Sequence, residues 1–177
     1  MKVIDLITEQ SARLKQAGVS FGHGTTNSFD EAAWLVLWAL GMQFGDLESK
    51  AKRELTPQEQ AKAEALVTER IATRKPAAYL TREAWLQNVP FHVDERVIVP
   101  RSFIAELLAD GEGEGTLDAW LSERTVRVLD LCTGNGSLAV IAAMAYPEIT
   151  VDACDLSADA LAVARINVDR HRLPPPP

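Results

Sequence analysis

One stretch of the sequence limits the fold more than any other. An apolar segment, VRVLDL, leads into the glycine-containing turn at residues 132–136, and a second apolar segment with helical spacing follows it. A further strand-like run, residues 149–154, ends at Asp155, and an amphipathic helix capped by Ser157 comes next. Parallel strands need a long crossover, usually a helix, so strands that alternate with helices predict a parallel α/β unit. The first of these strands is expected to be buried.

The N-terminal residues 1–75 predict a helical domain. Apolar side chains recur at spacings of three and four, which is typical of amphipathic helices. Ser28 followed by Glu31 predicts a capping box at the start of one helix, and Thr56 followed by Glu59 predicts another. Pro76 is expected to end the last helix. The buried stripe of the second helix is expected to contain these residues: Trp34, Leu35, Leu37, Trp38 and Met42.

Residues 76–115 change period and predict a β-hairpin and linker. Apolar side chains alternate on both sides of a turn placed at Asn88-Val89-Pro90. Pro100-Arg101-Ser102 is expected to start a short helix that runs through Leu108. GEGEGT, residues 111–116, has the composition of a flexible linker. The expected organisation is therefore a helical domain (1–75), a hairpin and linker (76–115), and an α/β domain (116–177).

Composition excludes several classes of protein. The chain has 177 residues, of which 47% are apolar and 24% charged, as expected for a soluble globular protein. Its net charge of -7 argues against a duplex-binding protein and against a polybasic membrane anchor. We find no apolar run long enough to cross a bilayer and no signal peptide. The two cysteines are expected to be buried thiols, which suit a reducing compartment, so we expect a cytoplasmic protein. The histidines and cysteines do not have the spacing of metal ligands.

The first strand–helix turn carries the chemistry. Gly134 permits a tight turn, and Gly136 is expected to let a ligand approach the backbone closely. Amides at the start of the next helix would face that ligand. Asp155 ends the next strand, where an acidic residue accepts hydrogen bonds from ribose hydroxyls. This combination predicts an adenosine-containing cofactor.

Two cofactor classes fit these residues. The run from Gly134 to Ala139 matches G-x-G-x-x-A, the dinucleotide fingerprint, which would make the protein an NAD-dependent oxidoreductase. Asp130, however, would repel a pyrophosphate and attract the ammonium group of S-adenosylmethionine. We therefore favour S-adenosylmethionine and keep the dinucleotide as the alternative.

Three segments resemble the protein-glutamine methyltransferases. VLDLCTGNGSLA with ACDLSADALAVARIN resembles the cofactor region of class I methyltransferases, and residues 76–102 resemble the hairpin and Pro-Arg segment of that family. FGHGTTNSFDEA, with PRS after the hairpin, resembles the branch that modifies large-subunit ribosomal protein L-three; the other branch modifies peptide release factors. The resemblance implies an N-terminal substrate-recognition domain, a hairpin, and the start of a Rossmann-like sheet, as in the N-terminal part of that family.

The resemblance also implies roles for single residues. Arg101 would line the substrate or methionine pocket, and Thr133 would bond the methionine carboxylate. The ribosomal protein would be the partner, with no direct binding to nucleic acid and none to a membrane. The cofactor-binding residues implied are Asp130, Cys132, Thr133, Gly134, Asn135, Gly136, Asp155 and Leu156.

One departure from the family concerns catalysis. Family members orient the substrate amide with an Asn-Pro-Pro-Tyr motif, which these residues lack. Asn88-Val-Pro-Phe91 is similar to it only superficially and is interpreted as a turn. No catalytic residue is therefore assigned, the sheet is expected to be truncated, and little methyl transfer is expected from these residues alone. An inactive fragment that binds ribosomal protein is the further alternative.

Overall fold

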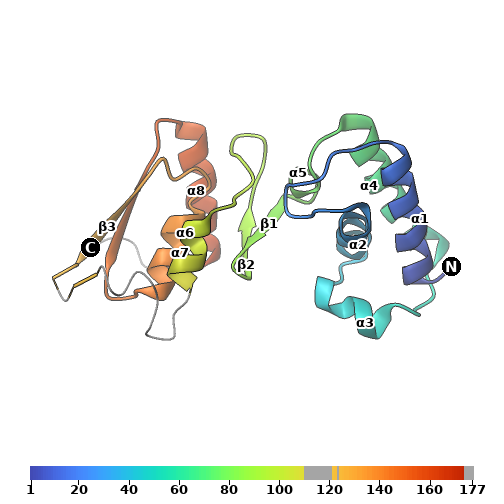
Figure 1. The fold of residues 1–177 in the computed structure, drawn as a ribbon, viewed down its shortest axis with the longest axis horizontal. Helices are drawn as coiled ribbons and strands as arrows, with labels where there is room; N and C mark the ends of the chain where they lie inside the picture. Colours follow the sequence, from blue (N-terminus) through green and yellow to red (C-terminus); the bar gives the residue numbers. More distant parts are fainter. Residues whose placement is uncertain (110–120, 123, 174–177) are drawn as a thin grey trace. The chain divides into compact units, whose positions relative to one another are not determined.

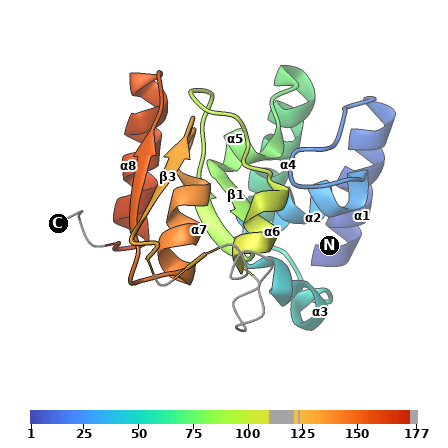
Figure 2. The ribbon, with the colours of Figure 1, turned by 60° about the vertical axis from the view of Figure 1, so that its left-hand side comes forward.

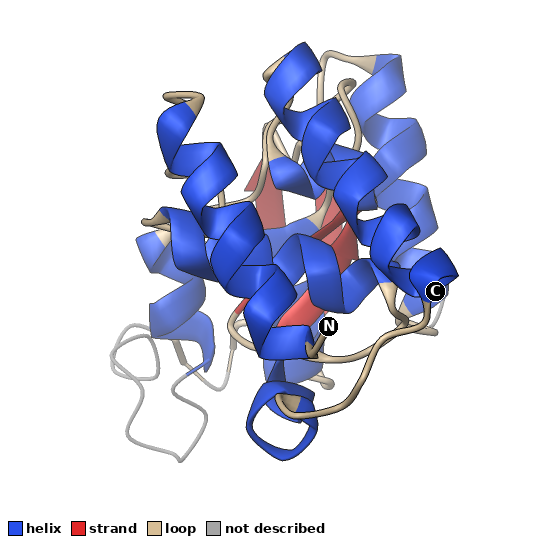
Figure 3. Ribbon diagram, turned by 90° about the vertical axis from the view of Figure 1, so that its right-hand side faces the viewer, coloured by secondary structure: helices blue, strands red, loops and turns tan. Residues whose placement is uncertain are grey.

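The chain folds into two compact units. A computed structural model describes residues 1–109, 121–122 and 124–173, and the units are Met1–Thr81 and Arg82–Pro177 (Figure 1). Within the described residues, every named strand belongs to the second unit, and the first is helical (Figure 3). The expected linker at 111–116 lies outside the described residues. No helix in the described part of the chain combines the length and apolar character needed to cross a membrane.

The first unit is built from helices around one apolar core. Thr56 caps α4 as predicted: its side chain accepts a hydrogen bond from Glu59 N at 3.2 Å, and Glu59 Oε2 accepts one from Thr56 N at 2.9 Å. Helix α4 ends at Thr73, before Pro76 as predicted, but a further short helix, α5, follows this proline. The elements are α1 (Val3–Gln16), α2 (Ser28–Ala39), the 3-10 turn η1 (Phe44–Asp46), α3 (Leu47–Lys50), α4 (Pro57–Thr73) and α5 (Ala77–Thr81).

The predicted capping box of α2 is wrong. Asn27 is the cap, because its Oδ1 accepts hydrogen bonds from Phe29 N and Asp30 N at 3.0 and 2.9 Å. Glu31 is buried instead and accepts a hydrogen bond from Arg70 Nε at 2.8 Å. An asparagine one residue earlier caps the helix, which leaves the glutamate free to pair with a buried arginine.

Trp38 is not part of the buried stripe that the sequence predicted. It is 40% exposed, whereas Leu35 and Leu37 are buried. Most of the circumference of α2 is covered by the unit, and the side that remains outward carries Asp30, Trp34 and Trp38 at four-residue intervals. The tryptophan pair therefore lies on the less buried side of the helix.

In its described residues, the second unit contains a hairpin, a pair of parallel strands and three helices. The hairpin turns at Gln87 and Asn88, one residue earlier than predicted, and both have positive φ, 49° and 59°. Val89 and Pro90 therefore belong to its second strand. The elements are β1 (Glu83–Leu86), β2 (Val89–His92), α6 (Phe103–Ala109), β3 (Arg127–Leu131), α7 (Ser137–Ala145), β4 (Thr150–Cys154) and α8 (Ala158–Arg170).

The hairpin is fixed to the last helix by polar contacts. Arg170 donates a hydrogen bond to Glu83 Oε2 at 2.9 Å, and the His171 ring lies 2.9 Å from Pro90 O. Asn167 bonds both main-chain groups of His92. The hairpin therefore belongs structurally to the α/β unit.

Strands β3 and β4 are parallel, as predicted, with Leu131 beside Cys154. The expectation that β3 is buried is wrong, because Leu129 and Leu131 are 60% and 70% exposed. Their alternating positions point them to one side of the two-stranded sheet, and α7 packs on the sheet from the other side (Figure 2). The expectation of buried thiols fails too, since Cys132 is exposed and Cys154 only partly buried.

Candidate functional site

The glycine-containing turn connects β3 to α7. Three of its five residues have left-handed backbone angles: Cys132, Gly134 and Gly136, with φ of 63°, 57° and 80°. Thr133 N donates a hydrogen bond to Cys154 O at 2.9 Å, which holds the turn against the end of β4. The parallel register thus brings the turn next to Asp155, as the sequence predicted.

Asp155 is bound directly to the turn. Its Oδ2 accepts a hydrogen bond from Gly134 N, and its Oδ1 accepts one from Ser157 N, both at 2.9 Å. These N–H groups, that of Ser157 first and that of Gly134 second, hold the pKa of the Asp155 carboxyl below its ordinary value. The group is therefore ionised at neutral pH, and it keeps acceptor capacity beyond these bonds.

Asp130 and Thr133 form a second pair in the turn. Thr133 Oγ1 donates to Asp130 Oδ2 at 2.6 Å. A hydroxyl has one proton to donate, so this bond uses the donor that the resemblance assigned to a methionine carboxylate. Thr133 is 7% exposed and fixes the orientation of Asp130. No described residue donates to the other oxygen of Asp130.

Most main-chain amides of the turn are already used. Gly134 N bonds Asp155, Gly136 N bonds Thr133 O at 2.9 Å, and Ser137 N bonds Asn135 Oδ1 at 3.2 Å. Asn135 is 4% exposed, and its Nδ2 has no hydrogen-bond partner in the described part of the chain. A buried donor without an acceptor is costly, so Asn135 Nδ2 is a polar group of the turn whose hydrogen-bonding capacity the described residues do not use.

The two glycines of the turn are required for different reasons. A Cβ on Gly136 would lie 3.0 Å from Ala164 Cβ and 3.2 Å from Ala164 Cα, so glycine is needed here for the packing of α7 against α8. The sequence interpretation assigned that space to a ligand. A Cβ on Gly134 would meet nothing within 4 Å. The space beside the backbone is therefore open at Gly134.

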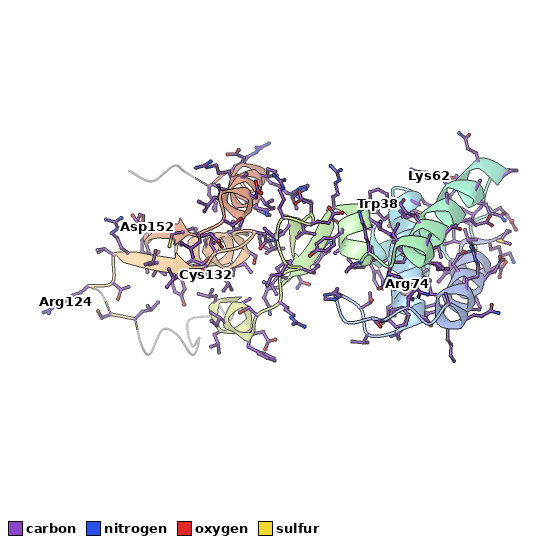
Figure 4. The ribbon with its side chains drawn as sticks, turned by 90° about the horizontal axis from the view of Figure 1, so that it is seen from above. Trp38, Lys62, Arg74, Arg124, Cys132 and Asp152 are labelled. Atoms are coloured by element: carbon purple, nitrogen blue, oxygen red, sulfur yellow. The ribbon has the colours of Figure 1, made fainter. Side chains whose placement is uncertain are left out.

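The remaining residues implied by the resemblance lie on the surface. The Cys132 side chain is exposed beside the sheet (Figure 4), and Leu156 is fully exposed next to Asp155. Arg101, just before α6, is exposed and has no ion pair with any described residue. Among the residues that the structure describes, no group of three or more His, Cys, Asp or Glu side chains could hold a metal.

Asn167 is a site residue that the sequence analysis missed. It is fully buried, and its Nδ2 donates a hydrogen bond to Asn135 O at 2.8 Å. Ala164 is buried and Val168 packs against an apolar cluster on the same side of α8. A polar residue between them on that face was the signal available, because buried amides need specific partners.

Two parts of the chain match known domain families. Residues 5–81 match the PrmC N-terminal domain, and residues 112–174 match the methyltransferase small domain. The second match contains the glycine turn and Asp155.

Curated relatives match nearly the whole chain. A ribosomal protein uL3 glutamine methyltransferase of Burkholderia pseudomallei is 51% identical over 97% of this chain and 55% of its own length. Proteins of the same name from Bordetella pertussis and Bradyrhizobium diazoefficiens are 46% and 44% identical over 96% and 97% of this chain, and over 56% and 54% of their own lengths. The chain thus spans about half the length of these relatives. The sequence resemblance is confirmed: this chain is a relative of the ribosomal protein uL3 glutamine methyltransferases.

Proposed function

We propose that these residues form the cofactor-binding turn and the substrate-recognition domain of an S-adenosylmethionine-dependent protein methyltransferase. Its substrate is the side-chain amide of a glutamine in large-subunit ribosomal protein uL3. The substrate rests on the names of the relatives. The cofactor rests on the methyltransferase small domain and on the chemistry of the turn. The observation that carries the proposal is the glycine turn lying between two carboxylates, Asp130 and Asp155.

The residues present fit this cofactor. Asp155 keeps acceptor capacity for ribose hydroxyls, and Asp130 has an oxygen without a described donor for an ammonium group. Asn135 Nδ2 is a buried donor with no acceptor among the residues that the structure describes, suited to a carboxylate or a ring nitrogen. The open side of Gly134 leaves room for a ligand. When bound, S-adenosylmethionine supplies a methyl group on a positively charged sulfur, and the protein side of the site is rich in negative charge.

A dinucleotide fits less well. Its pyrophosphate would need free amides at the turn, yet those of Gly134, Gly136 and Ser137 already have internal partners. The Asp155 carboxylate bonds the turn itself, and a second negative group beside it would be repelled. The internal hydrogen bonds therefore favour a cationic ligand over a pyrophosphate.

The amide-orienting step is not assigned to a residue. An amide nitrogen is a weak nucleophile, so transfer depends on positioning and on acceptors for its N–H bonds. These residues contain no Asn-Pro-Pro-Tyr motif that could provide those acceptors. We expect the 177-residue chain to bind the cofactor and to transfer little methyl to ribosomal protein.

Calorimetric titration with S-adenosylhomocysteine and with NAD tests the proposal. The chain should bind the adenosyl compound and not NAD. Asp155→Ala should weaken binding about tenfold or more, since charge-assisted hydrogen bonds are lost. Asp152→Ala is the matched control, because Asp152 lies on β4, the strand that Asp155 follows, and pairs with Arg127 of β3 away from the turn. This variant should leave the affinity unchanged. Binding of NAD alone would contradict the proposal.

A further inference from the structure

Asn167 connects two parts of the α/β unit that are far apart in the sequence. Its Oδ1 accepts a hydrogen bond from His92 N at 2.7 Å, and its Nδ2 donates to His92 O at 3.0 Å. The same Nδ2 donates to Asn135 O at 2.8 Å. One side chain of α8 thus bonds the second strand of the hairpin and the middle of the glycine turn.

The bond to the turn is buried, because Asn167 is 0% exposed and Asn135 is 4% exposed. The two bonds to His92 are partly buried. The side-chain amide of Asn167 bonds the N–H and the C=O of His92, in the way that a neighbouring strand would. One of the two Nδ2 hydrogens is used for His92 O, and the other is left for the turn. A move of the turn relative to α8 would break a buried hydrogen bond and leave the Asn135 carbonyl without this partner.

We propose that Asn167 is a positioning residue that couples the β1–β2 hairpin to the ligand-binding turn. A ligand that fixes the turn then also stabilises the hairpin. In the other direction, disorder of the hairpin lowers the affinity of the turn for the ligand. Such coupling is reciprocal, because it is a free energy shared by the two sites. The ligand part of this inference rests on the function proposed above.

The test uses hydrogen exchange at single amides of the full chain. In the wild type, saturating S-adenosylhomocysteine should slow exchange at the His92 amide as well as at the Gly134 amide. Asn167→Asp keeps the size and the acceptor for His92 N but replaces the donor that bonds the two carbonyls. In this variant the ligand should still protect Gly134 but no longer His92, and its Kd should rise about tenfold, the effect of losing one buried hydrogen bond.

Val168→Ala is the matched control on the same helix. Val168 packs against the apolar cluster that contains Phe91 and Val140. A valine side chain makes no hydrogen bond, so the control lowers stability without breaking the connection. Here the ligand should protect Gly134 and His92 together. If Asn167→Asp behaves like Val168→Ala, the coupling is overturned and Asn167 is only a packing residue.

Failure of the proposed function would give a different result. If the wild type binds no S-adenosylhomocysteine, that function is contradicted, and the coupling is then judged on the ligand-free protein. Asn167→Asp should then speed exchange at the His92 and Gly136 amides together, relative to Val168→Ala. Unchanged exchange at Gly136 would overturn the inference. Where the wild type does bind S-adenosylhomocysteine and Asn167→Asp does not fold, the wild type alone decides: protection of Gly134 without protection of His92 would overturn the coupling.

Discussion

The two units differ in how completely they cover their apolar side chains. In Met1–Thr81, the core side chains of α1 and α2, such as Leu6 and Leu35, are 0% exposed. In Arg82–Pro177, β3 leaves Leu129 and Leu131 mostly exposed, although Val140 on the neighbouring α7 is fully buried. The first unit therefore depends on a closed core with a buried ion pair, and the second depends on the fixed geometry of one turn and its polar contacts.

Glu31→Ala should cause the largest loss of stability, and this loss should be limited to the helical unit. The substitution leaves Arg70 charged and buried, since both side chains are 3% exposed. We expect a loss of about 3–5 kcal/mol in the free energy of unfolding of this unit, measured by urea unfolding followed by NMR signals of each unit.

A double variant separates charge from packing in the same measurement. Replacing Glu31 and Arg70 together by methionine removes the unpaired charge and should restore much of the stability. Lys50→Ala removes an exposed ion pair and should change the free energy of unfolding little. A change in Glu31→Ala no larger than that of Lys50→Ala would show that the buried pair does not support the helical unit.

Gly136→Ala should destabilise the α/β unit next most. It forces a Cβ to 3.0 Å from Ala164 Cβ at a φ of 80°, and overpacking together with a left-handed angle costs about 2–4 kcal/mol. Thermal unfolding observed at signals of the second unit measures this loss.

Gly134→Ala is the comparison for that variant. The residue has a φ of 57° but open space around the Cβ position. Stability should fall less, by about 1–2 kcal/mol for the backbone angle alone, while S-adenosylhomocysteine binding should weaken. Equal losses of stability in the two variants would contradict the different roles assigned to the glycines.

The pH dependence should also distinguish the two units. Hydrogen bonding by Arg53 and then by Thr56 N lowers the pKa of Glu59 from 4.5 to about 2. A carboxyl with a lowered folded-state pKa stabilises the fold above its unfolded pKa, and this stabilisation is lost as the pH falls through the folded value. The helical unit should therefore weaken between about pH 4.5 and pH 2.

Glu59→Gln removes this titration but keeps a side chain able to complete the capping box. Its urea midpoint for the helical unit should depend less on pH over that range than the wild-type midpoint does. The midpoint of the α/β unit should respond to acid in the same way in both proteins. A parallel pH dependence of the helical unit in the two proteins would contradict the assignment to Glu59.

Leu131→Ser should have the smallest effect. The side chain is 70% exposed on the open side of the sheet, and surface substitutions usually change stability by no more than about 0.5 kcal/mol. Val140→Ala, at a buried position of the same unit, should cost clearly more in the same urea titration. A large loss from Leu131→Ser would show that this side of the sheet is covered.

The sequence predicted the elements well and their exposure less well. Local signals located Thr56 and Pro76, since a capping box and a missing N–H act within one turn of helix. Trp38 and Leu131 were misjudged because exposure depends on what packs against an element, and periodicity records only which side of it is apolar. The glycine turn was located from spacing alone.

The internal bonds of the candidate site could not be predicted from spacing. Asp155 follows β4 in the sequence, but its bond to Gly134 depends on the parallel register. Thr133 and Gly136 have partners, Asp130 and Ala164, that only the packed turn defines. Sequence patterns therefore identified the residues of the turn, and the fold decided which of their atoms remain free for a ligand.

The close approach of Gly136 to Ala164 also limits how this protein can change. Ala164 and Asn167 are three residues apart on α8 and share a face of the helix. A larger side chain at position 164 would push α7 and α8 apart. This movement would take Asn167 out of hydrogen-bonding distance of Asn135 and His92. Substitutions at position 164 should thus be restricted to small residues, even though an alanine side chain makes no hydrogen bond.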